Sequence, residues 1–232
     1  MREIFFVIVA AGKGLRTGLK INKVFYTFKG KTVLERCIES VLKFPHINGI
    51  ILVVRKKNKK ILNLVRKYDK IKSIVEGGKR RMDSVISGLN SVLNLCSSPE
   101  DTVVMIHDAA RPFVSQNVVR SMLKFVKPGT GVIPVIPVDN TLKKVSSDKI
   151  KSTVNREDMV EVQTPQAFIL KDIINAYKRL KDRNKVPTDD AEVFERIGGT
   201  VKVVTGDIFS FKITWKEHLL LYKMVVKNRC LE

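Results

Sequence analysis

The chain has few cysteines and no long apolar run. Its three cysteines, Cys37, Cys96 and Cys230, are odd in number and lack the spacing of metal ligands. This favours free thiols in a reducing compartment, so we expect a cytoplasmic protein. The longest apolar runs are about eight residues, too short to cross a bilayer, and no membrane partner is expected. No stretch rich in proline, glycine or serine divides the 232 residues, which predicts a single domain.

Acidic residues are also scarce. The 43 Lys and Arg face only 23 Asp and Glu, which gives a formal net charge of +20. Nine of the cations lie close together, namely Arg55, Lys56, Lys57, Lys59, Lys60, Arg66, Lys67, Lys70 and Lys72. They form either a surface for nucleic acid or the solvated face of a helix over Asn58–Tyr68. Such a helix would turn Ile61, Leu62, Leu64 and Val65 inward.

Few aromatic residues lie among these charges, and no nucleic-acid motif occurs. The helix face is therefore favoured, although the charge alone still supports a basic nucleic-acid-binding protein as an alternative. We expect no specific nucleic-acid partner, and a general attraction for anionic substrates.

Apolar runs of strand length alternate with amphipathic segments along the chain. The expected strands are Ile4–Ala11, Gly49–Val54, Lys72–Val75, Thr102–Ile106, Gly131–Ile136, Val201–Thr205 and Phe209–Thr214. Helices are expected from a Thr32 cap up to Pro45, over Asn58–Tyr68, over Met82–Leu93, after a Ser115 cap, and over Lys171–Leu180, Thr188–Ile197 (with Gly198 as its C-cap) and Glu217–Asn228. Repeated βα units predict an α/β sandwich with a mainly parallel sheet.

One strand and the segment after it break this regularity. Pro134 lies inside Gly131–Ile136, and a proline within a strand predicts an edge position or a bulge. Residues 137–156 are largely polar, which is typical of a projecting hairpin or arm rather than of the core.

The first strand leads directly into a loop with two glycines and two cations, Gly12-Lys13-Gly14-Leu15-Arg16. Glycines let the backbone approach a ligand closely, and the cations favour an anion, so a phosphate site at the carboxyl edge of the sheet is predicted. A tight turn without a ligand is the alternative. A Walker loop is excluded because no Gly-Lys-Ser/Thr follows. A dinucleotide site is opposed by Thr17 at the place of the third glycine, although Arg55 after the second strand leaves an NADP-dependent oxidoreductase open.

Two charged residues point to phosphate chemistry. Asp108 ends a buried strand, where a carboxylate is well placed to hold Mg²⁺ on a nucleoside triphosphate. Lys212 stands inside an apolar strand, and a lysine there needs an anion or water at its tip. The neighbouring His107 is expected to pack or orient, and Arg111 to form a phosphate or structural fork. Asp207 is the nearest second carboxylate in sequence to Lys212.

Several short motifs occur in one order along nearly the whole chain. They are Ala10–Arg16, Lys23, Glu76-Gly77-Gly78, Asp83-Ser84-Val85, His107-Asp108-Ala109-Ala110-Arg111-Pro112, Asn155-Arg156, Gln163-Thr164-Pro165-Gln166, Thr188-Asp189 and Phe211-Lys212-Ile213-Thr214. Together they resemble the 2-C-methyl-D-erythritol 4-phosphate cytidylyltransferase family. The two motifs around Asp108 and Thr164 carry most of the specificity, because many sugar-nucleotide transferases share the first one.

The resemblance implies a Rossmann-like nucleotidyltransferase sandwich with a mainly parallel twisted sheet and a projecting β-arm for dimerisation. It implies an enzyme that transfers CMP from CTP to 2-C-methyl-D-erythritol 4-phosphate. The products would be 4-diphosphocytidyl-2-C-methyl-D-erythritol and pyrophosphate, in non-mevalonate isoprenoid biosynthesis. It further implies a homodimer and Mg²⁺ or another divalent cation.

The resemblance also implies roles for particular residues. The loop of Ala10, Ala11, Gly12 and Gly14 would bind the nucleotide, with Gly78, Asp83 and Ser84 completing the base and ribose pocket. Arg16, Lys23 and Lys212 would be catalytic around the α-phosphate, and Asp108 would bind the metal and substrate. Thr141, Arg156, Thr164, Thr188 and Asp189 would bind substrate, and the arm would act partly in the neighbouring subunit.

The chain departs from the family pattern at a few positions. Asn22 and Val24 flank Lys23, where the family usually has Pro and Gln, and Met159-Val160-Glu161 replaces a common tryptophan. A ribitol-5-phosphate cytidylyltransferase is the nearest alternative. That sister family tends to Ala-Gly-Gly in the first loop and His-Asp-Ser-Val-Arg-Pro at the metal strand. Ala10-Ala11-Gly12 and Ala109-Ala110 favour the methylerythritol phosphate enzyme.

Overall fold

The computed structural model describes residues 2–228 except 13, 15–17, 20, 57–58 and 181–185, and in residues 59–60 it describes the backbone alone. In these ranges the main sheet has eight strands in the order β10-β7-β11-β6-β1-β4-β5, with β12 also paired to β7. The strands are β1 (Glu3–Ala10), β4 (Gly49–Val54), β5 (Ile71–Glu76), β6 (Thr102–Asp108), β7 (Thr130–Pro137), β10 (Val160–Val162), β11 (Gln166–Ile169) and β12 (Thr200–Thr205). Strands β6, β1, β4 and β5 are mutually parallel, and β12 is parallel to β7. The mainly parallel α/β fold predicted from the sequence is confirmed.

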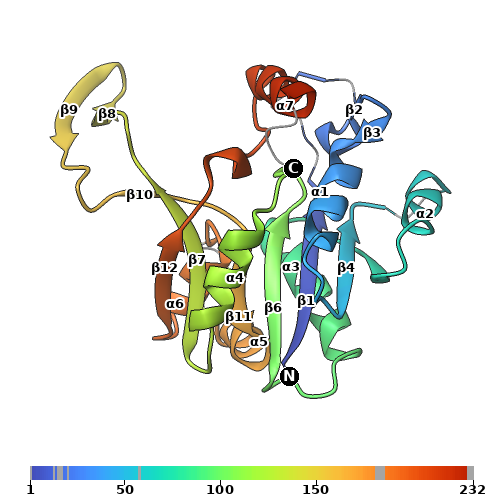
Figure 1. The fold of residues 1–232 in the computed structure, drawn as a ribbon. Helices are drawn as coiled ribbons and strands as arrows, with labels where there is room; N and C mark the ends of the chain where they lie inside the picture. Colours follow the sequence, from blue (N-terminus) through green and yellow to red (C-terminus); the bar gives the residue numbers. More distant parts are fainter. Residues whose placement is uncertain are drawn as a thin grey trace.

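Helices cover both faces of this sheet (Figure 1). They are α1 (Val33–Leu42), α2 (Lys59–Val65), α3 (Arg81–Leu93), α4 (Gln116–Phe125), α5 (Leu170–Arg179), α6 (Asp190–Glu195) and α7 (Glu217–Asn228). Strand β1 shows why: Phe6 and Ile8 pack in one core with α1, α2 and α4, whereas Phe5 and Val7 pack in a second core with α3, α5 and α6. Successive side chains of a strand face opposite sides, so a run apolar at every position needs cover on both.

Helix α1 begins where the sequence predicts. The Thr32 side chain accepts a hydrogen bond from the Glu35 backbone N–H, and the Glu35 carboxylate accepts one from Thr32 in return. This reciprocal pairing satisfies two backbone donors that a helix start leaves open. Helix α7 packs on the first turn of α1 through a third core of Val33, Ile213, Leu219 and Tyr222, and it lies beyond the carboxyl edge of the sheet (Figure 1).

The structure corrects the predicted place of Pro134. Strand β7 is interior, because β12 pairs with one of its edges and β10 and β11 with the other. The Pro134 carbonyl accepts from Gln163 N–H on the β10–β11 side. Since the N and C=O of a strand residue face the same neighbour, the missing donor faces the break between β10 and β11. That break is why an interior strand tolerates the proline.

Two further expectations were wrong in detail. Phe209–Thr214 is not a strand: a 3-10 helix, η3 (Ile208–Ser210), is followed by residues 211–214 without regular structure. Its start is capped by Asp207, whose Oδ1 accepts from Phe209 N–H at 2.8 Å. In α2, Ile61 and Leu64 are buried as predicted, but the Leu62 residue is 40% exposed. The basic segment therefore turns only part of its predicted apolar face inward.

The predicted projecting segment forms a separate two-stranded sheet of β8 (Leu142–Ser146) and β9 (Lys149–Val154), joined in antiparallel register. It extends away from the main sheet between β7 and β10 (Figure 1). A second small hairpin, β2 (Thr27–Phe28) and β3 (Lys31–Thr32), follows the short 3-10 helix η2 (Lys23–Phe25). No helix in the described ranges is long and apolar enough to cross a membrane.

Candidate active site

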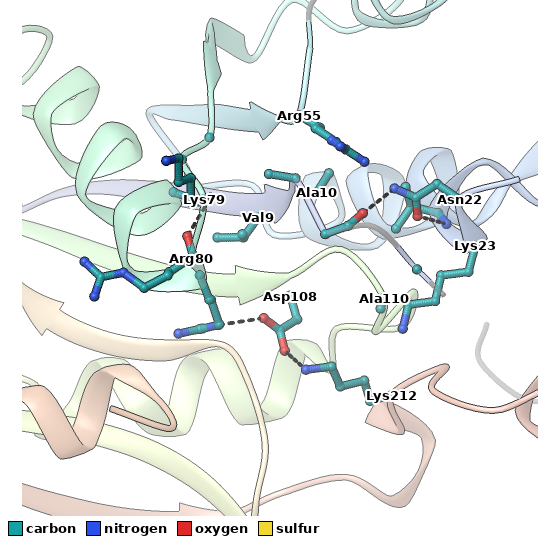
Figure 2. A pocket seen from close by; sticks show the side chains of 18 residues that line it. Val9, Ala10, Asn22, Lys23, Arg55, Lys79, Arg80, Asp108, Ala110 and Lys212 are labelled. Carbon is teal, nitrogen blue, oxygen red and sulfur yellow. Dashed lines mark hydrogen bonds and ion pairs between the residues drawn. The ribbon is translucent and has the colours of Figure 1, made fainter. Parts of the chain in front are cut away.

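A cavity of about 980 Å³ opens at the carboxyl edge of the sheet. Its walls are the ends of β1 and β6, the loop after β1, the start of α3 and the segment after η3 (Figure 2). Ligands of open α/β sheets bind outside the carboxyl ends of the strands, so the cavity lies where the fold favours a site. It is also of the size that encloses a small-molecule ligand.

The cavity is strongly cationic. Six basic residues line it: Lys23, Arg55, Lys79, Arg80, Arg81 and Lys212. Among the described residues of its lining, Asp108 is the single acidic one. Such a concentration of positive charge around one concave space attracts a ligand with several negative charges, such as a polyphosphate.

In the described part of the loop after β1, the cavity is lined by the small residues Ala11, Gly12 and Gly14. Gly14 has φ +72°, and a Cβ there would lie 2.9 Å from the Asn22 side-chain oxygen. Asn22 ties this loop to η2, because its Nδ2 donates to the Gly12 carbonyl at 2.6 Å and its Oδ1 accepts from Val24 N–H at 3.3 Å. These two hydrogen bonds fix the loop at Gly12 relative to η2, and the glycines leave no Cβ that would keep a ligand away from the backbone at positions 12 and 14.

The opposite wall is equally close-packed. A Cβ at Gly77 would lie 2.5 Å from both Ala11 Cβ and Ser84 Oγ, and one at Gly78 would lie 2.3 Å from Asp83 Cβ. These two glycines therefore let the turn after β5 lie directly against the first loop and the start of α3. Neither position accepts a side chain without a shift of its neighbours.

Asp108 stands at the centre of the cationic wall. Its Oδ2 accepts from Lys212 Nζ at 2.6 Å (Figure 2). Its Oδ1 accepts from Arg81 Nε at 3.2 Å. Burial alone would raise the pKa of Asp108, but the charges of Arg81 and Lys212 outweigh it and hold the pKa well below its usual range. Asp108 is therefore an ionised carboxylate at neutral pH.

His107 and Thr164 form a chain of hydrogen bonds that ends at the Asp108 backbone N–H. His107 is fully buried, and its Nε2 lies 2.9 Å from the Arg111 carbonyl, which can only accept, so Nε2 carries the proton. Its Nδ1 then accepts from the Thr164 hydroxyl at 3.0 Å, and that oxygen accepts from Asp108 N–H at 3.1 Å. Burial lowers the pKa of His107 to about 4, so the imidazole is neutral and orients the strand end.

Arg81 and Asp190 belong to the same cluster, and sequence reasoning missed both. The Arg81 guanidinium holds the Asp190 carboxylate with two hydrogen bonds, at 2.8 and 3.1 Å. Asp190 is fully buried and also accepts from the Tyr177 hydroxyl at 2.5 Å. Burial would lower the pKa of Arg81, but Asp190 and Asp108 outweigh it and raise the pKa, so Arg81 stays charged. No local pattern indicated this ion pair, because an acidic residue at the start of a helix is typical of an N-cap.

The predicted site residues that the structure describes fall into three groups. Those that line the cavity are Ala10, Ala11, Gly12, Gly14, Lys23, Gly78, Ser84, Asp108 and Lys212. Four do not line the cavity and have other partners. Asp83 accepts from Arg80, and the Thr164 hydroxyl accepts from Asp108 N–H. Thr188 donates to Glu192, and Asp189 caps α6 and accepts from Gln166. Thr141 and Arg156 lie on the arm, where Arg156 donates to the Asp139 carbonyl. Arg16 lies outside the described residues, as does Cys230.

The donor set suits Mg²⁺ when phosphate is present. The described residues contain no group of three or more His, Cys, Asp or Glu that could hold a metal alone. Asp207, the second carboxylate considered, caps η3 instead. Mg²⁺ commonly takes one or two carboxylates together with waters and substrate phosphates, so the single Asp108 carboxylate fits that cation together with a nucleotide.

Comparison with known proteins gives consistent matches over the whole fold. A family model described as 2-C-methyl-D-erythritol 4-phosphate cytidylyltransferase (IspD) matches residues 4–228. Proteins with that name from Alkaliphilus oremlandii (strain OhILAs) and Clostridium novyi (strain NT) are 35% and 37% identical to this chain. The alignments cover 96% of this chain in both cases, and 94% and 96% of the two relatives.

A solved structure is also similar over nearly the whole chain. The 4-diphosphocytidyl-2C-methyl-D-erythritol synthase from Anaerococcus prevotii DSM 20548 superposes with a TM-score of 0.80 at 31% identity, covering 97% of this chain and 96% of that one.

Proposed function

Because the chain belongs to the 2-C-methyl-D-erythritol 4-phosphate cytidylyltransferase family, we propose that it transfers CMP from CTP to 2-C-methyl-D-erythritol 4-phosphate. The family membership confirms the resemblance carried by the sequence motifs. It does not favour the ribitol-5-phosphate alternative. The observation that carries the proposal is the cationic cavity at the carboxyl edge, with a glycine loop on one side and Asp108 and Lys212 on the other.

The chemistry follows from the charges. A phosphate oxygen of the acceptor attacks the α-phosphorus of CTP, a new P–O bond forms, and the bond to the bridging oxygen breaks so that pyrophosphate leaves with the electron pair. Two anions approach each other in this step, so cations that strengthen their contacts in the transition state lower the barrier. Lys23 and Lys212 line the cavity for this role, and we assign Arg16 to it from the family motif.

No general base is needed, because the attacking phosphate is already ionised at neutral pH. This agrees with a His107 that is buried, neutral and committed to Arg111 and Thr164. Asp108 would hold Mg²⁺, which when bound neutralises charge on the triphosphate.

We further infer that a second copy of the chain completes the acceptor site. Thr141 and Arg156, the arm residues expected to hold methylerythritol phosphate, are not among the residues that line the cavity of their own chain. An arm that extends away from its own sheet is suited to reach a partner (Figure 1). The cytoplasmic location expected from the sequence remains a prediction.

The direct test is pyrophosphate release from CTP and Mg²⁺, with methylerythritol phosphate and ribitol 5-phosphate offered separately. Release only with methylerythritol phosphate is expected. Release only with ribitol 5-phosphate would retain the cytidylyl transfer and replace the acceptor. No release with either, from folded protein, would refute the proposed activity.

A further inference from the structure

The Asp108 carboxylate already carries two cationic partners, and they are held very differently. Arg81 is held by a second carboxylate. Asp190 accepts from both terminal nitrogens of its guanidinium, and Nε donates to Asp108. Asp190 is in turn held by the Tyr177 hydroxyl, and its backbone N–H donates to Gln166 Oε1 at 3.1 Å. Moving Arg81 would leave a fully buried carboxylate without its counter-ion, which is strongly unfavourable.

Lys212 has no comparable anchor on its ammonium among the contacts described. Its Nζ donates to Asp108 Oδ2 at 2.6 Å. The side chains of Lys212 and Arg81 are similarly exposed, at 35% and 29%, so the difference lies in the buried Asp190 that holds Arg81 alone. The backbone beside it is fixed, since the buried Ile213 donates its N–H to the Ala110 carbonyl at 2.9 Å. The ammonium can therefore leave Asp108 by side-chain rotation alone, without moving the chain.

We propose that Asp108 has one fixed and one exchangeable counter-ion: Arg81 stays and orients the carboxylate, while Lys212 leaves it when a divalent cation and a nucleotide bind. This inference rests on the proposed function, because it assigns the released ammonium to the phosphates of CTP. In the free protein Lys212 occupies the oxygen that a divalent cation needs. Binding of the cation alone must break this ion pair, whereas phosphate replaces Asp108 as the partner of Lys212 when CTP is present.

Two consequences distinguish this arrangement from a simple open carboxylate. A divalent cation binds weakly to the free protein, because it competes with an ammonium already in place. Removing that ammonium strengthens cation binding, although Lys212 belongs to the cationic wall of the cavity. A residue needed only for folding, or only for contact with phosphate, would not have this effect.

The test is titration of the nucleotide-free protein with Mn²⁺, with free Mn²⁺ followed by electron paramagnetic resonance. Lys212→Gln should bind Mn²⁺ about tenfold more tightly than the unmodified protein, the factor expected for one charge-assisted hydrogen bond. Lys212→Arg keeps the positive charge and should bind as the unmodified protein does. Lys171→Gln is the matched control, since Lys171 is an exposed lysine paired with Glu100 on the surface. Melting temperatures establish that each variant is folded.

Each result of the Mn²⁺ titration either supports or overturns the proposed exchange of Lys212. Unchanged or weaker Mn²⁺ binding by Lys212→Gln would overturn the exchange, and so would equal tightening by Lys212→Arg. Asp108→Asn should abolish the binding, and retention of Mn²⁺ by that variant would place the cation elsewhere and also overturn the inference. Turnover is measured separately. Tightening by Lys212→Gln without any turnover of the unmodified protein would refute the proposed reaction and leave the exchange standing.

Discussion

Replacing Lys212 with alanine should separate catalysis from stability. The ammonium faces the cavity and is 35% exposed, and Asp108 keeps Arg81 as a partner when it is removed. Loss of a partly exposed ion pair changes the free energy of unfolding by at most about 1 kcal/mol. Loss of one preorganised group that stabilises transition-state charge typically lowers kcat about 100- to 1000-fold. The expected effect on turnover is therefore far larger than the effect on folding.

The assay is pyrophosphate release at saturating CTP and methylerythritol phosphate, with urea unfolding of the same preparations. Lys171→Ala removes an equal charge from the surface pair with Glu100 and should alter neither measurement appreciably. If Lys212→Ala keeps turnover within about threefold of the unmodified enzyme, Lys212 has no transition-state role of the size argued here. If stability falls by several kcal/mol instead, the ion pair is structural and the division between Arg81 and Lys212 is wrong.

Other perturbations test separate parts of the structure. Gly78→Ala should raise the KM for CTP with little change in acceptor KM, because its Cβ would lie 2.3 Å from Asp83 Cβ and displace the cavity wall; unchanged KM for CTP would contradict the close-packed wall. Glu35 contributes stability that depends on pH: burial would raise its pKa, but its hydrogen bonds in the helix cap lower it. The stability difference between the unmodified protein and Glu35→Gln should therefore be full above about pH 4.3 and shrink as the pH falls further, measured by urea unfolding at pH 6 and 3. Tyr177→Phe should cost about 1.5–3 kcal/mol in chemical unfolding, because Asp190 loses a buried hydrogen bond; no loss would mean that Arg81 alone satisfies this carboxylate.

Local patterns were sufficient for the elements that depend on local physics. The β1 run is apolar at every position because both faces are covered, and Thr32 and Glu35 encode their own cap. Phe209–Thr214 has an alternating pattern that resembles a strand, yet no neighbouring strand pairs with it in the described structure, and Asp207 starts a 3-10 turn there. A strand needs a partner, and a pattern within six residues cannot show whether one is available.

The sequence likewise predicted some residues of the candidate site and missed others. The glycine loop and Asp108 stand at strand ends, where the sequence alone indicates a ligand edge. The pairing of Arg81 with Asp190 joins residues 109 positions apart, so no local pattern contains it. Asp189 and Asp190 illustrate the limit: they are adjacent in sequence, but the first caps α6 and the second is the buried counter-ion of Arg81 in the cationic wall.

Asn22 shows how a departure from the family pattern can preserve the local backbone geometry. Proline at this position would fix φ near −65°, and Asn22 has φ −62° without that constraint. The conformation is instead held by the side chain, which bonds to Gly12 on one side and to Val24 on the other. These two contacts connect the first loop to the start of η2, where Lys23 is almost fully buried against the cavity. The substitution therefore replaces a covalent restraint with a hydrogen-bonded one, and it leaves Lys23 on the same cationic wall as Lys212.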